Sequence, residues 1–138
     1  MRLWHKDLIP FLPRQQLLGQ WRECCLIAKN IAEKGTPNHV LVNPIMDYPL
    51  DHFITYQYLV WKEMRNRGYE PDDQKFYQWI PKKRRRVRSL IDVSELFPGW
   101  HTRRYLTQCL ANLEEKYDRG GITEEEWKYI LKGVNRIR

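Results

Sequence analysis

Residues 13–35 read PRQQLLGQWRECCLIAKNIAEKG, which is one unbroken amphipathic pattern. Proline suits the first position of a helix, and glycine commonly follows the last. The apolar residues recur every three or four positions, as on a helix with one buried face. They are Leu17, Trp21, Cys24, Cys25, Ala28, Ile31 and Ala32. We therefore expect a helix over this range.

A second face of this helix gathers Gln16, Gly19, Gln20 and Glu23 at about 100° per residue. A glycine inside a helix costs about 1 kcal/mol relative to alanine. Here it would leave room for the N-terminal segment or a ligand, unless it is simply a tolerated surface glycine. Together with residues 1–5, this face could bring a terminal amine, an arginine and a carboxylate together. An amine-based DNA lyase needs those three groups.

The rest of the chain predicts three more helices, over residues 49–67, over 101–118, and from Thr123 onward. Thr123 and Glu126 have the spacing of a capping box. Residues 36–47 predict a loop with at most one brief extended piece, and residues 69–99 are the least regular part. The expected fold class is all-α: a compact single domain over residues 1–138, with three main helices plus a C-terminal helix.

The net charge of +7 is concentrated in one run of basic residues, which we expect to form a loop. The run is Lys82, Lys83, Arg84, Arg85, Arg86 and Arg88. The remaining 18 basic residues nearly balance the 17 acidic ones. This run and the pI near 9.4 indicate a polyanionic partner whose phosphates the run would contact. A solvated charge run that binds nothing specific is the alternative.

Three cysteines without framework spacing favour reduced thiols and a cytoplasmic location, nucleoid-associated when the protein is bound to DNA. The longest near-apolar stretch, residues 56–61, is too short to span a bilayer, so no membrane partner is expected. The sequence carries no Gly-rich phosphate loop, and its four histidines lack zinc spacing. We expect neither a metal nor a small-molecule cofactor.

Two ordered groups of residues carry a resemblance to a known family. The first is Arg2, Gln15, Leu17 and Arg22–Glu23; the second is Gly35, His39–Val40 and residues 65–69, RNRGY. In this order and spacing, the first seventy or so residues resemble the phage endonuclease V family of pyrimidine dimer DNA glycosylases. The later part, including Trp100–His101 and Tyr105–Leu106, is similar to small bacterial proteins grouped with that family.

The resemblance implies a small all-α glycosylase with a coupled abasic-site lyase. The α-amine of Met1 would attack the sugar C1′ through a Schiff base, and Glu23 would assist proton transfer. DNA, expected to be double-stranded and damaged or abasic, would contact Arg2, Gln15, Gln16, Arg22 and the basic run. The residues His5, Gly19 and Gln20 would lie beside the site. The family has a histidine at the position of Gln16 and an arginine at that of Leu26.

Acid–base chemistry favours an α-amine as the nucleophile. An α-amine of pKa about 7.7–8.0 is roughly a quarter neutral near pH 7.4, whereas a lysine near 10.4 is about a thousandth neutral. Two other interpretations stay open: a non-catalytic basic nucleic-acid-binding module that keeps the fold, and a protein-interaction domain that uses the C-terminal helix. Without the resemblance, Glu23 would be an ordinary solvated residue.

Overall fold

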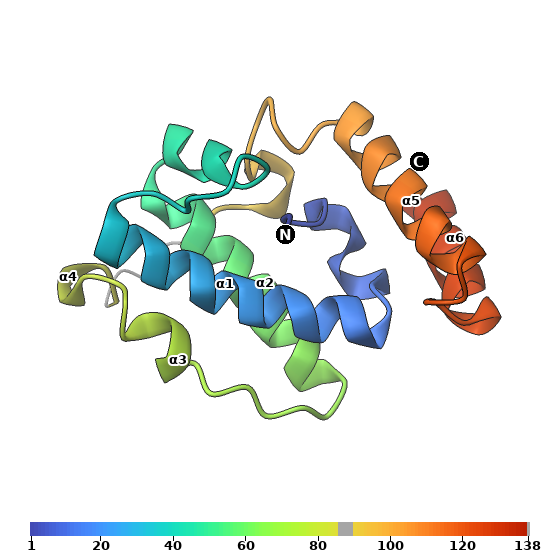
Figure 1. Ribbon diagram of the computed structural model, residues 1–138, viewed down its shortest axis with the longest axis horizontal. Helices are drawn as coiled ribbons and strands as arrows, with labels where there is room; N and C mark the ends of the chain where they lie inside the picture. The colour runs from blue at the N-terminus through green and yellow to red at the C-terminus, as the bar shows by residue number, and fades with distance from the viewer. Residues whose placement is uncertain (86–89, 138) are drawn as a thin grey trace.

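The computed structural model describes residues 1–85 and 90–137, and every regular element in these ranges is helical (Figure 1). The long helices are α1 (Arg14–Lys34), α2 (Leu50–Asn66), α5 (Arg103–Asp118) and α6 (Glu124–Ile137). The short ones are η1 (Lys6–Phe11), η2 (Asn43–Asp47), α3 (Gln74–Tyr77), α4 (Lys82–Arg85) and η3 (Val93–Glu95). The all-α prediction of three main helices plus a C-terminal helix is confirmed.

The predicted helix ends agree closely with the structure. Helix α1 follows Pro13 and stops at Gly35, whose φ of 74° is the left-handed conformation that glycine adopts without strain. Helix α6 begins at the predicted capping box. The Thr123 N–H donates to Glu126 Oε1 at 3.0 Å, and the Glu126 N–H donates to Thr123 Oγ1 at 3.1 Å.

The buried face of α1 differs from the predicted stripe. Gln20 and Ile27 are buried, whereas Ala32 is exposed. Sequence periodicity assigned Gln20 to a polar face, but the N-terminal segment covers that face. A glutamine is therefore part of the interior of the protein.

Helices α1 and α2 pack against each other, and α6 packs against η1. Figure 1 shows α5 and α6 side by side at one end of the molecule, with α1 and α2 at the other. Apolar side chains from Leu3 to Val134 form one core that joins these parts. None of the helices within the described ranges is long and apolar enough to cross a membrane.

The segments predicted to be irregular hold short helices and turns. The apolar run at residues 40–42 forms a turn, and η2 follows it. Residues 69–99 contain α3, α4 and η3. The basic run was expected to be a loop, but its first four residues form α4. This expectation was wrong because Pro81 precedes the run and its carbonyl accepts the Arg84 N–H at 2.8 Å.

Candidate active site

The first five residues form no regular secondary structure and enter the interior of the protein. The first residue lies near the middle of the molecule, beside α1 (Figure 1). Leu3, Trp4 and His5 are all buried. A buried segment outside helices and strands needs other partners for its backbone groups, since unpaired buried N–H and C=O groups are costly. Side chains from three helices supply those partners.

Gln20 of α1 is the main anchor of this segment, and it is only 1% exposed. Its Oε1 accepts a hydrogen bond from the Trp4 N–H at 2.8 Å and lies 2.8 Å from the Tyr56 hydroxyl. Its Nε2 donates to the Arg2 carbonyl at 2.9 Å and to Glu23 Oε2 at 3.2 Å. Gln20 therefore connects the N-terminal segment directly to the Glu23 carboxylate.

Two tyrosines hold the next two carbonyls. Tyr105 of α5 donates to the Leu3 carbonyl at 2.6 Å, and Tyr56 of α2 lies 2.6 Å from the Trp4 carbonyl. Burial raises the pKa of both hydroxyls, so both stay protonated and able to donate. Gln20 binds the carbonyl of Arg2, and the two tyrosines bind the next two. Three consecutive carbonyls of the N-terminal segment are therefore held by side chains.

Glu23 is half-buried, and its surroundings place it near the chain terminus. Burial raises the pKa of its carboxyl, because removal from water disfavours the charged form. The positive charge of the Met1 amine is the strongest opposing influence. A hydrogen bond from the Arg2 backbone and the charges of His39 and Arg22 act in the same direction. The structure thus brings the terminal amine, the backbone of Arg2 and the side chain of Arg22 near Glu23.

The comparison with known families agrees with this geometry. A family model described as pyrimidine dimer DNA glycosylase matches residues 1–77, which include Met1, Gln20 and Glu23. The chain belongs to the pyrimidine dimer DNA glycosylase family. No curated protein and no solved structure matches the chain. DNA is the substrate that the family description names, and repair of damaged DNA is the process it serves.

The side chains of Arg2 and Arg22 differ in how firmly their surroundings hold them. The Arg2 guanidinium lies 5.6 Å from the centre of the Trp4 ring and hydrogen-bonds to Tyr105, so it is half-buried and held. Arg22 is exposed. Its Nη2 lies 3.9 Å from where a Cβ on Gly19 would be, and this is the nearest atom to that point. The N-terminal segment therefore does not fill the space at Gly19. This space is left open for a ligand.

Gln15 and Gln16, the two glutamines predicted to contact DNA, lie in the first turn of α1. Gln15 is exposed. Gln16 is half-buried, and its Oε1 meets no donor among the described residues. This orphaned oxygen, an acceptor without a partner, suits a group supplied by the substrate.

His5 supports the fold of this glycosylase. Its Nδ1 accepts the Asp7 N–H at 3.1 Å, and its Nε2 lies 3.1 Å from the His101 carbonyl. His101 in turn accepts the Lys6 N–H at its Nδ1, 3.0 Å away. Burial lowers the pKa of both histidines, that of His101 to about 2, so both rings are neutral near pH 7. These contacts occupy both ring nitrogens of His5 and tie residues 5–7 to the start of α5.

The basic run does not join this site. Figure 1 shows α4 at one end of the molecule, away from the N-terminus. Arg84 forms an ion pair with Asp51, and Arg85 donates to the Ile80 carbonyl at 2.8 Å. Lys82 and Lys83 are exposed. Arg86 and Arg88 lie outside the described residues.

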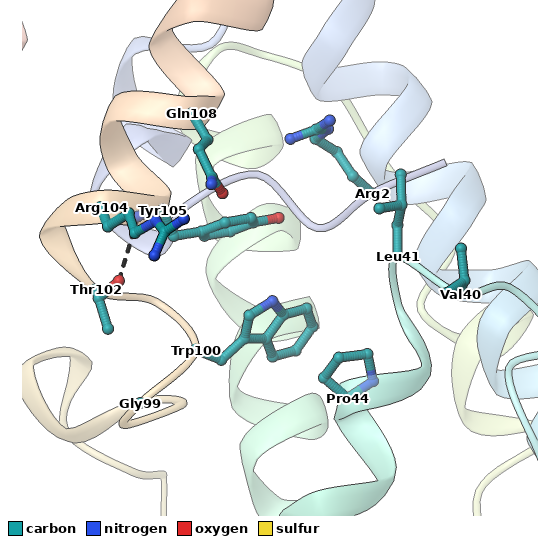
Figure 2. Close-up of a pocket in the computed structure, with 10 residues that line it drawn as sticks. All are labelled: Arg2, Val40, Leu41, Pro44, Gly99, Trp100, Thr102, Arg104, Tyr105 and Gln108. Atoms are coloured by element: carbon teal, nitrogen blue, oxygen red, sulfur yellow. Dashed lines mark hydrogen bonds between the residues drawn. The ribbon is translucent and has the colours of Figure 1, made fainter.

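A cavity of about 560 Å³ opens beside Arg2 (Figure 2). Most of its wall comes from residues beyond the stretch that matches the family: Gly99, Trp100, Thr102, Arg104, Tyr105 and Gln108. Sequence reasoning missed this cavity, because no local pattern shows that residues 99–108 meet residues 40–44. Within residues 1–85 and 90–137, no group of three or more His, Cys, Asp or Glu side chains is placed to hold a metal ion.

Proposed function

We propose that the protein is a DNA glycosylase with a coupled abasic-site lyase activity, in which the α-amine of Met1 is the nucleophile. One observation carries the proposal: the charge of the Met1 amine acts on Glu23, while Gln20 bonds both Glu23 and the Arg2 carbonyl. The segment that bears the amine is therefore held in place before the substrate arrives. Preorganisation of this kind lowers the cost of reaching the reactive geometry.

The chemistry begins with the neutral amine, which attacks the sugar C1′. The C1′–N bond to the base breaks, and the base leaves with the electron pair and takes up a proton. The attached amine then loses a proton, the C1′–O4′ bond breaks as the C=N bond of the Schiff base forms, and O4′ takes up a proton. Removal of a proton from C2′ then permits β-elimination, which breaks the C3′–O bond and cuts the strand. Each step moves one proton, so a single carboxylate within hydrogen-bond reach can serve several of them.

Glu23 is the residue proposed to move these protons. Burial raises the pKa of its carboxyl, so it holds a proton at a higher pH than an exposed glutamate does. This shift brings its protonation equilibrium closer to neutral pH, where an acid–base group works best. The Gln20 amide fixes one of its oxygens.

The substrate is proposed to be duplex DNA that is damaged or abasic. Arg2, Gln15, Gln16 and Arg22 lie near the amine or at the start of the same helix and would hold the strand around the attacked nucleotide. Lys82 and Lys83 would contact phosphates farther along. Enzymes that reach C1′ within a duplex usually extrude a nucleotide.

Borohydride trapping on abasic-site DNA tests the proposal. Hydride reduces the C=N bond of the Schiff base, so the untagged protein should form a stable adduct whose DNA maps to residue 1. A variant with one extra residue before Met1 keeps an α-amine but moves it by about 3.5 Å, and it should trap poorly. The Glu23→Gln variant should fold like the wild type but cleave the strand more slowly. An adduct on Lys6, or none at all, contradicts the proposal.

A non-catalytic DNA-binding module is the second candidate. The bulky Arg2 beside the amine, and Gln16 and Leu26 where the family has a histidine and an arginine, favour it. This candidate predicts salt-sensitive binding with a slope of about −0.9 per contacted phosphate and no trapped adduct. Glu23→Gln would then change nothing measurable.

A further inference from the structure

A second cavity, which we call the α2–α3 cavity, has a volume of about 460 Å³ and lies between α2, α3 and α4. Its lining includes Ile54, Gln57, Tyr58, Trp61, Tyr77 and Arg84. Figure 1 shows α3 and α4 far from α5 and α6. The Tyr56 hydroxyl meets Gln20 beside the N-terminal segment, whereas the next residue of α2, Gln57, lines this cavity. The α2–α3 cavity is therefore separate from the candidate active site.

Gln57 is only 1% exposed, and one end of its side-chain amide has no partner. Its Nε2 donates to the Ile54 carbonyl at 3.3 Å and to the Tyr77 hydroxyl at 3.1 Å. A carbonyl can only accept, so the contact with Ile54 fixes which end of the amide is the nitrogen. The Oε1 atom meets no donor within residues 1–85 and 90–137. A buried acceptor of this kind is costly unless a bound molecule supplies a donor.

Trp61 lies one helical turn further along α2 and has the opposite requirement. The residue is half-buried, and its indole Nε1 is buried without an acceptor in the described part of the chain. Residues four positions apart on a helix lie on the same face. The α2–α3 cavity therefore has one unpaired acceptor and one unpaired donor on the same wall.

A single residue of an extended peptide can satisfy both groups. Its N–H and its C=O point to the same side of the chain, as they do when two antiparallel strands pair. DNA phosphates, in contrast, offer only acceptor oxygens and would leave Gln57 Oε1 unpaired. The pair of unpartnered groups thus favours a peptide over a nucleic-acid backbone.

The charge around the cavity indicates which peptides would bind. All four residues of α4 are basic, and Arg84 lines the cavity. The Arg65 guanidinium lies over the Trp61 ring, 5.4 Å from its centre. Asp73 also lines the cavity, but the basic residues outnumber it. This excess of positive charge favours a peptide with carboxylates on both sides of the bound residue.

We propose that the α2–α3 cavity binds an extended acidic peptide segment of a partner protein. One residue of the segment donates its N–H to Gln57 Oε1 and accepts a hydrogen bond from Trp61 Nε1, while the flanking carboxylates face α4 and Arg65. The stacked rings of Tyr58 and Trp61, 5.9 Å apart, give the peptide an apolar surface. The inference does not depend on the proposed function, because none of these residues takes part in the proposed reaction.

An NMR titration of the indole N–H groups with the blocked peptide acetyl-Asp-Val-Thr-Val-Asp-amide tests the proposal. The chain has six tryptophans, and Trp61→Phe identifies the Trp61 signal by removing it. That signal should move downfield and saturate, because the N–H gains an acceptor. The signal of Trp79, which lines a different cavity, should stay in place. If no signal saturates at millimolar peptide, or if all six move alike, the inference is wrong.

Affinities for a fluorescent form of the same peptide provide the second test. Trp61→Phe keeps an aromatic ring and removes only the donor, so the affinity should fall by about tenfold. Trp79→Phe is the matched control and should bind as the wild type does. A peptide with lysines in place of the aspartates should bind more weakly. Equal affinities for wild type and Trp61→Phe contradict the inference.

A short undamaged DNA duplex distinguishes the alternative occupant. If the duplex moves the Trp61 signal and the peptide does not, the cavity contacts DNA and the inference is overturned. Gln57→Met removes the unpaired oxygen and should also weaken peptide binding, but it removes the bond to Tyr77 as well. Trp61→Phe therefore decides the test if Gln57→Met does not fold. Borohydride trapping by Trp61→Phe should match the wild type and reports the proposed function separately.

Discussion

The side-chain amide of Gln20 lies 3.2 Å from the Glu23 carboxylate, three residues along the same helix. The same nitrogen donates to the Arg2 carbonyl at 2.9 Å. One buried side chain therefore sets the position of the proposed acid–base group and of the segment that carries the proposed nucleophile. This coupling makes Gln20 the most informative position for mutation.

Gln20→Ala should destabilise the fold and slow the reaction together. The substitution leaves the Trp4 N–H and the Arg2 carbonyl without their hydrogen-bond partners. Each buried polar group left unpaired costs about 1–3 kcal/mol of stability. We expect a decrease of about 3 kcal/mol in the free energy of unfolding, measured by urea denaturation. At a temperature where the variant is still folded, the rate of trapping should also fall. Gln15→Ala, an exposed change on the same helix, should leave stability within about 0.5 kcal/mol of wild type.

Two glycines in helices should respond to alanine with opposite signs. A Cβ on Gly133 would lie 2.4 Å from the Phe11 ring, so Gly133→Ala should cost about 1–3 kcal/mol through overpacking. A Cβ on Gly19 meets only Arg22 Nη2 at 3.9 Å, so Gly19→Ala should raise stability by up to about 1 kcal/mol. Thermal unfolding measures both.

The Gly19→Ala variant also tests whether DNA approaches this helix closely. If the space at Gly19 receives the DNA backbone, the variant should be more stable and yet bind abasic DNA more weakly. Unchanged affinity would show that the glycine is merely tolerated there.

The stability of the protein should fall below pH 6.5 because of His101. Burial lowers the pKa of the folded-state ring to about 2, while the unfolded chain titrates near 6.5. As the pH drops below 6.5, only the unfolded state takes up the proton, so stability decreases by about 1.4 kcal/mol per pH unit. Between pH 6.5 and pH 5 this amounts to about 2 kcal/mol.

His101→Gln isolates this effect, since its amide oxygen can still accept the Lys6 N–H and does not titrate. The difference in stability between wild type and variant should narrow by about 2 kcal/mol from pH 6.5 to pH 5, measured by urea denaturation at each pH. If the difference in stability stays constant over this range, the prediction is wrong, because the folded protein then takes up the His101 proton as the unfolded chain does.

The basic run should divide into two functional pairs. Lys82 and Lys83 are exposed, so replacing both by alanine should reduce the salt dependence of DNA binding by about 0.9 for each phosphate that the variant no longer neutralises. Replacing Arg84 and Arg85 should instead lower the unfolding midpoint, because they bind Asp51 and the Ile80 carbonyl. Binding titrations at several salt concentrations measure the first effect, and an unchanged slope would contradict a DNA-contacting role for the lysines.

Local patterns predicted the helices well, because caps and periodicity depend on neighbouring residues. The capping box at Thr123 and the stop at Gly35 are examples. The same periodicity placed Gln20 and Glu23 on one face, which is correct. It could not predict that this face is covered, since the covering segment comes from the chain terminus.

The remaining features depend on contacts between distant residues. The Tyr105–Leu3 bond spans 102 positions and the Tyr56–Trp4 bond spans 52, so no spacing in the sequence points to them. The cavity beside Arg2 likewise needs residues 40–44 and 99–108 to meet. The pairing of Arg84 with Asp51 escaped prediction for the same reason.

The backbone bonds of residues 3–6 make the two halves of the chain interdependent. A fragment that ends at residue 77 would retain every position matched to the family, together with Met1, Gln20 and Glu23. It would nevertheless lack the hydroxyl that holds the Leu3 carbonyl and the imidazole that receives the Lys6 amide. The later half therefore fastens the N-terminal segment, and a fragment that keeps these two contacts must extend at least to Tyr105.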